Sequence, residues 1–205
     1  MARLTRKERQ AHTRRRLVDA AAHVGARRGL AAASLDEVAQ VAGYTKGAVY
    51  ANFASKEELF LAVLDERFAE RLAQIERVFG SDAAPAAQAA EAGADLTRAL
   101  AADRDWQRLF LEFAVHAARD AAFRERLTAR YRALRRRIAE VLERRMREAG
   151  VTPAVSPADL ALMTFAMANG VALESLLEPD AVPDDLLARM YAILAEGAAR
   201  RPPAG

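Results

Sequence analysis

The residues whose spacing points to a particular task lie between Ala39 and Val49. A helix-turn-helix needs a small residue where its helices cross, a flexible residue in the turn, and an apolar residue on the second helix that packs back on the first. Ala39, Gly43 and Val49 supply these features in order. Thr45 and Lys46 begin the second helix, where free amides and the helix dipole favour a phosphate or a base acceptor. The spacing predicts a nucleic-acid-binding unit.

Residues for catalysis show no comparable grouping. The sequence contains no cysteine, which excludes disulfides and thiolate metal sites, and its three histidines are scattered. It has neither an HExxH motif nor a phosphate-binding glycine loop. We therefore expect no enzyme activity, no metal site and no cofactor. Two alternatives stay open: an all-helical enzyme, and a helical protein-interaction module, which would explain the C-terminal helices but not the segment from Thr45 to Lys56.

The distribution of charge favours a polyanionic partner for the N-terminal part of the chain. The net charge is only +3, but the first 60 residues hold 11 Lys and Arg against 6 Asp and Glu, whereas the remaining 145 hold 20 against 22. The basic excess therefore belongs to the N-terminal part, as expected of a region that binds nucleic acid.

No segment is expected to be exported or to cross a membrane. The N-terminus is polar and basic, without the apolar stretch of a secretory signal. The longest uncharged apolar stretch lies between Asp159 and Glu174, and its 14 residues are too few for a span that needs about 20. We interpret this stretch as a buried helix and expect a cytoplasmic protein that associates with the nucleoid through DNA binding.

Hydrophobic periodicity predicts helices along the chain, with no strand pattern and no internal repeat. A first helix stops at Gly29, and Ser34 begins the next with a capping box in which Glu37 reaches back. Thr45 caps a third helix, and Ser55 begins a fourth with a second capping box. The expected ranges are about 6–28, 35–43, 45–52 and 56–79.

The C-terminal two thirds of the chain continue the helical pattern after a break. The alanine-rich segment 81–94 has the composition of a linker. A helix expected from Pro157 to Leu177 is apolar nearly all round, so it must be covered on more than one side. The other helices carry Trp106 to Ala117, Phe123 to Met146, and Pro183 to Arg200, and the proline-rich tail 201–205 is expected to be disordered.

The run from Val38 to Leu59, VAQVAGYTKGAVYANFASKEEL, closely resembles the signature of the TetR family of helix-turn-helix transcription regulators. The resemblance covers roughly Leu17 to Leu64, and the later helices agree with the family in number, length and order. It implies an all-α fold of about nine helices. Residues 1–60 would form a three-helix DNA-binding head, and residues 61–200 a ligand-binding and dimerisation body.

The resemblance also implies particular DNA contacts. The helix from Thr45 to Asn52 would enter the major groove, where Gly47 lets the backbone approach the DNA closely. Tyr50 would contact a phosphate or a base edge, and Lys56 would bind a phosphate. The predicted DNA-binding residues are Ser34, Thr45, Lys46, Gly47, Tyr50, Asn52 and Lys56.

Three residues depart from the family's pattern. Gly25 stands where a buried Phe is usual, and it should destabilise the first helix by about 1 kcal/mol relative to Ala. Tyr44 stands in place of a small aliphatic residue and Asn52 in place of His or Tyr, so the base preference stays open. Outside the motif, Arg14–Arg16 would add nonspecific phosphate attraction, whereas Arg135–Arg137 are interpreted as a solvated face.

The resemblance implies a homodimer whose body binds a small molecule and whose two heads bind a palindromic operator. A ligand that favours the wrong spacing of the heads would release the DNA, by linkage. The predicted ligand-binding residues are aromatic, methionine and a few polar side chains: Trp106, Phe110, Phe113, His116, Tyr131, Met163, Met167, Asn169 and Glu174. The predicted dimer interface comprises Met163, Met167, Gly170, Val171, Leu186 and Met190.

Overall fold

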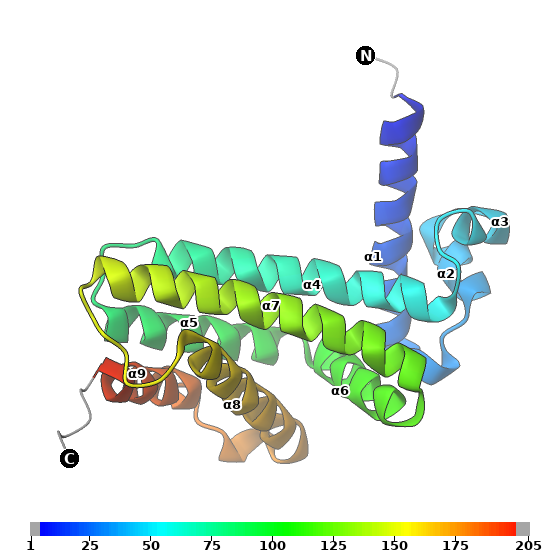
Figure 1. Ribbon diagram of the computed structural model, residues 1–205. Helices are drawn as coiled ribbons and strands as arrows, with labels where there is room; N and C mark the ends of the chain where they lie inside the picture. Colours follow the sequence, from blue (N-terminus) through cyan, green and yellow to red (C-terminus); the bar gives the residue numbers. More distant parts are fainter. Residues whose placement is uncertain (1–4, 200–205) are drawn as a thin grey trace. The chain divides into compact units, whose positions relative to one another are not determined.

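The computed structural model describes residues 5–199, and this part of the chain is helical without any strand (Figure 1). The expected all-α fold is confirmed. The predicted disordered tail, 201–205, lies outside the described residues. In chain order the helices are α1 (Arg6–Ala32), α2 (Leu35–Ala42), α3 (Lys46–Tyr50), α4 (Lys56–Phe79), α5 (Pro85–Ala102), α6 (Arg104–Arg119), α7 (Ala121–Glu148), α8 (Pro157–Leu177), the 3-10 helix η1 (Pro179–Ala181) and α9 (Leu186–Ala199).

The chain divides into two compact units. The first unit is Met1–Arg67 together with Arg108–Leu127, and the second is Phe68–Gln107 together with Thr128–Gly205. The boundaries fall within α4, α6 and α7, so each of these helices contributes residues to both units.

The first unit is built around an apolar core, and its short helices begin and end at local signals. The Ser34 hydroxyl accepts the Glu37 N–H at 3.1 Å and starts α2. Gly43 then turns the chain with a φ of 76°, a conformation that costs glycine little. The Glu37 carboxylate accepts from Arg28 at 3.3 Å, and no reach-back bond of a capping box is formed at this helix. The buried core side chains include Leu17, Val24, Val38, Val49, Phe53, Leu59, Phe60, Leu109, Phe113 and Phe123.

In the second unit α5 packs closely on α9, and α4, α7 and α8 pack on one another. Gly93 of α5 makes the first contact possible, since a Cβ there would lie 2.5 Å from the carbonyl oxygen of Leu187. The Tyr191 hydroxyl donates to the Thr164 carbonyl at 3.0 Å, and burial raises the pKa of Tyr191 to about 12. Two apolar clusters form this core: Val78, Ala89, Ala92, Val171, Leu187 and Tyr191, and Ile75, Leu134, Ile138, Val141 and Ala161.

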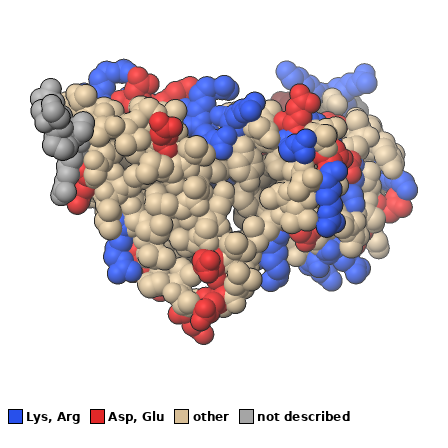
Figure 2. All heavy atoms as spheres, turned by 60° about the horizontal axis from the view of Figure 1, so that its bottom comes forward, with Lys and Arg blue, Asp and Glu red and all other residues tan. Residues whose placement is uncertain are grey.

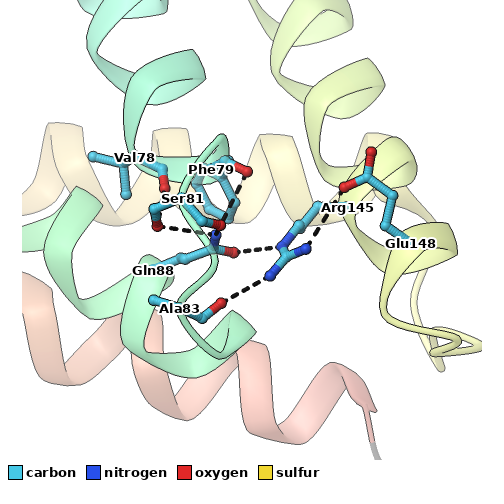
Figure 3. Close-up of polar contacts among 7 residues, drawn as sticks. All are labelled: Val78, Phe79, Ser81, Ala83, Gln88, Arg145 and Glu148. Atoms are coloured by element: carbon cyan, nitrogen blue, oxygen red, sulfur yellow. Dashed lines mark hydrogen bonds and ion pairs between the residues drawn. The ribbon is translucent and has the colours of Figure 1, made fainter.

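The expectation of a linker over 81–94 is wrong, because α5 begins at Pro85 within that segment. A polar network holds the start of α5 (Figure 3). Gln88 is fully buried, and its Nε2 donates to the Ser81 carbonyl at 2.6 Å. Its Oε1 accepts from Arg145 Nε of α7 at 2.8 Å, and the same guanidinium donates to the Ala83 carbonyl at 2.8 Å. The alanine-rich composition of the segment does not reveal these hydrogen bonds.

The expectation that α8 is a buried helix is also wrong for the single chain. Only 22% of its most apolar 18-residue window is buried. By length and composition alone, with a mean hydropathy of 1.6, α8 could cross a membrane, as could many core helices of soluble proteins. In Figure 2 charged side chains are sparse on the side where α8 and α9 face the reader. Exposed apolar residues on this helix are Leu162, Met163, Leu173 and Leu177.

Candidate nucleic-acid interface

Helix α3 is anchored by one side chain and exposes the next. Val49 is fully buried in the first unit, whereas the Tyr50 side chain is 54% exposed. The Thr45 hydroxyl accepts the Ala48 N–H at 3.4 Å and caps the helix, and Gly47 lies on its exposed surface. The anchored Val49 therefore fixes which face of α3 is turned outward.

Lys46 lies at the exposed N-terminal end of α3 and is paired with α2. Its ammonium donates to the Asp36 carboxylate at 2.9 Å, and both side chains are more than half exposed. This hydrogen bond and the carboxylate charge raise the pKa of Lys46, so the side chain stays cationic. A phosphate that binds Lys46 must therefore compete with Asp36.

Other predicted contacts are engaged in internal hydrogen bonds. The Lys56 ammonium donates to the carbonyls of Ala31 and Ala33, at 2.9 and 3.2 Å. Asn52 Nδ2 donates to the Ala48 carbonyl at 2.8 Å, and its buried Oδ1 has no hydrogen-bond partner within residues 5–199. Lys56 thus also holds the connection between α1 and α2, while Asn52 closes the end of α3.

Sequence reasoning missed Glu112. Helix α1 is interrupted at Gly29, whose φ is 75°, and the next amide, of Leu30, donates to the Glu112 carboxylate of α6. A Cβ at position 29 would collide with that carboxylate. The break at Gly29 leaves amides that need an acceptor, which was the available signal. The acceptor stands 82 residues away in sequence, so no local pattern reveals it.

In the first unit, two of the predicted ligand-binding residues gather on one aromatic ring. Phe113 is fully buried and stacks on Phe123, with 6.1 Å between ring centroids. His116 meets the edge of the same ring at 4.6 Å, and its buried Nε2 has no hydrogen-bond partner in the described part of the chain. The Asp120 carboxylate lies 3.9 Å from that nitrogen. Phe110 is half-buried on the same helix.

The second unit holds the remaining predicted ligand-binding residues. Tyr131 packs edge-on against Phe68 and Phe165, at 5.5 and 5.6 Å between ring centroids, and burial raises its pKa. Glu174 is exposed, Met163 is 42% exposed, and half-buried positions are held by Trp106, Met167 and Asn169. Phe68 was not predicted as a ligand-binding residue, although it lies on an apolar helical stripe.

Of the residues predicted for a dimer interface, Met163 and Gly170 are exposed. Val171 is buried in the core of its own unit. Met167, Leu186 and Met190 are partly buried against the same cluster.

Family models match most of the chain. Residues 17–63 match the model of bacterial regulatory proteins of the TetR family, and residues 85–201 match that of the C-terminal part of BetI-type transcriptional repressors. The chain belongs to the TetR family. The sequence resemblance is therefore confirmed, and the head with the exposed α3 lies in the part that matches the TetR model.

Individual relatives agree with this assignment. The HTH-type transcriptional regulator SrpR of Pseudomonas putida is 46% identical over 67 residues, which are 33% of this chain and 31% of that protein. The match thus spans less than a third of this curated relative's length. A transcriptional regulator from Rhodococcus sp. Rha1 is 28% identical, covers 92% of this chain and 99% of its own, and has a TM-score of 0.68. FadR from Bacillus subtilis, solved in complex with stearoyl-CoA, shares the TetR fold at 16% identity, with 89% and 98% covered and a TM-score of 0.72.

Proposed function

We propose that this TetR-family chain is a sequence-specific repressor that binds a palindromic operator as a homodimer. The proposal rests on the exposed face of α3, which presents Lys46, Gly47 and Tyr50. The buried Val49 holds the helix in place. In a helix-turn-helix protein the second helix of the motif contacts base edges in the major groove. Two such heads related by a two-fold axis contact two half-sites, which makes the operator palindromic.

The same proposal includes release of the operator by a small molecule. A ligand that binds more tightly to the form that cannot bind DNA weakens DNA binding, and DNA weakens binding of the ligand by the same factor. The aromatic side chains around Tyr131 and the polar Asn169 fit an apolar ligand with a few polar groups. The complex of FadR with stearoyl-CoA supports a ligand of this kind. We propose that the protein performs no catalysis and works in the cytoplasm on the nucleoid.

Selection from random duplex DNA tests the proposal directly. The purified chain is incubated with a random library at moderate salt, and the bound duplexes are sequenced. We expect a palindromic motif with two equal half-sites. A folded protein that enriches no motif would contradict sequence-specific binding.

Substitutions on α3 then test the assigned contacts. We expect Lys46→Ala and Tyr50→Ala each to weaken operator binding about tenfold, since the removal of one such interaction with DNA costs about 1–3 kcal/mol. Tyr50 is 54% exposed and Lys46 lies on the surface, so the helical content should stay unchanged. Arg136→Ala, an exposed change on α7, is the control. Wild-type affinity in both α3 variants would remove the assignment.

A further inference from the structure

The first three turns of α1 extend beyond the core of the first unit. Burial of α1 begins at Leu17, and among residues 5–16 only Thr13 is even half-buried. In Figure 1 this part of the helix stands clear of α2 and α3. Its start is nevertheless well defined, because Thr5 and Glu8 form a capping box, with bonds of 2.7 and 3.2 Å. Packing within the chain does not explain why these turns are helical.

The exposed turns are strongly basic and carry no large apolar side chain. A single acid, Glu8, stands against the cations, and the largest aliphatic side chain is that of Ala11. A membrane surface helix or a helix docked in a protein groove needs an apolar face, which is missing here. The chemistry fits a polyanion. The cations of the described turns are Arg6, Lys7, Arg9, Arg14, Arg15 and Arg16.

The basic side chains continue the face by which α1 packs on the head. At 3.6 residues per turn, Arg6, Arg9 and Arg14 fall within about 70° of the face that buries Leu17 and Val24. Arg14 fixes this orientation, since its guanidinium lies over the ring of Phe53 with 4.7 Å to the centroid. Phe53 follows α3 by one turn. The basic face is therefore turned toward the side of the head that carries α3.

We propose that the N-terminal turns of α1 are a second DNA-contacting element, which binds backbone phosphates beside the half-site read by α3. This inference rests on the proposed DNA-binding function. The eleven residues from Arg6 to Arg16 extend about 16 Å at 1.5 Å per residue. That is the length of about five base pairs at 3.4 Å each. Phosphate contacts add affinity and salt dependence but no sequence preference.

A matched pair of charge variants tests this element. The α1 variant is R6Q/K7Q/R9Q, which leaves Thr5 and Glu8 intact, and the control is R124Q/R132Q/R136Q, with three exposed arginines of α7. Binding to the selected operator is measured between 50 and 300 mM salt. The slope of log K against log salt should fall by up to about 2.7 per protomer in the α1 variant, because each phosphate that is no longer neutralised lowers it by about 0.9. The control should keep the wild-type slope, and both should select the same motif.

Operator length provides a second readout. Extending the operator by six base pairs on each side should strengthen wild-type binding more than binding of the α1 variant. Equal slopes and equal gains in the α1 variant and its control would overturn the inference while leaving the proposed function intact. If the wild-type chain itself enriches no motif, the proposed sequence-specific DNA binding is contradicted, and the inference about α1 with it.

Discussion

At the scale of single residues, Gly25 is required by its neighbours. A Cβ at position 25 would lie 2.5 Å from Phe60 Cε1 and 3.0 Å from Leu109 Cδ2. Both neighbours are almost fully buried, so neither ring nor methyl group has room to move. The family usually places a Phe at this position, and here the ring of Phe60 from α4 lies against the glycine. The expected weakening of α1 by Gly25 is therefore offset by close packing.

We expect Gly25→Ala to destabilise the protein, although the same change stabilises an ordinary helix by about 1 kcal/mol. Overpacking in a filled core costs about 1–3 kcal/mol, which exceeds that gain. Urea unfolding measures the net effect. Phe60→Leu in the Gly25→Ala background should recover part of the loss, and a more stable Gly25→Ala protein would contradict the packing explanation.

Asp36 competes with DNA for Lys46, and we expect Asp36→Asn to strengthen operator binding by a few fold. The ion pair at 2.8 Å is solvent-exposed and contributes little to stability, so its removal frees the ammonium at little cost. Loss of a negative charge near α3 acts in the same direction. Fluorescence anisotropy with labelled operator measures the change. The gain should vanish in the Lys46→Ala background, and a gain that persists there would exclude this route.

At the scale of elements, helix boundaries set by neighbouring residues were predictable, whereas hydrogen bonds to residues far away in sequence were not. The boundaries at Ser34, Gly43 and Thr45 followed from caps and a turn that involve neighbouring residues only. Helix α5 was not predicted because Gln88 is held by Arg145, 57 residues farther along. Glu112 was not predicted for the same reason, because the Leu30 amide that it accepts lies 82 residues away in sequence. The contacts proposed for α3 could be assigned to particular residues because the family signature is contiguous in sequence.

The network around Gln88 should determine the stability of the second unit. We expect Gln88→Met, which keeps the side-chain length, to lower the free energy of unfolding by about 2–3 kcal/mol. The substitution removes the buried amide that bonds the Ser81 carbonyl and Arg145 Nε, and a neutral hydrogen bond contributes about 0.5–1.5 kcal/mol and one to a charged group about 1.5–3 kcal/mol. Thermal unfolding followed by circular dichroism measures it. Arg147→Gln, on the exposed side of α7, is the control and should change little.

At the scale of the whole molecule, the α8 surface is the feature a single chain leaves unexplained. Leu162 and Leu177 are 50% and 71% exposed, and Ile193 of α9 is 68% exposed. A cluster of exposed apolar side chains indicates an interaction surface. A second copy of the chain is the partner that the proposed palindromic operator requires, because a two-fold interface pairs the same surface of both copies.

Gly170 allows this interface to be tested without disturbing the protomer. Apart from the neighbouring residues and backbone of α8, no atom of residues 5–199 lies within 4 Å of a Cβ built at this position, so a larger side chain fits there and removes a helical glycine. We expect Gly170→Arg to keep the helical content yet to sediment as a 22.4 kDa monomer. Val115→Arg, at a position on α6 that is 55% exposed, should stay dimeric. Operator affinity should fall at least a hundredfold in the Gly170 variant, because two linked heads bind far more tightly than one. A Gly170→Arg protein that stays dimeric and keeps its operator affinity would place the contact between copies elsewhere.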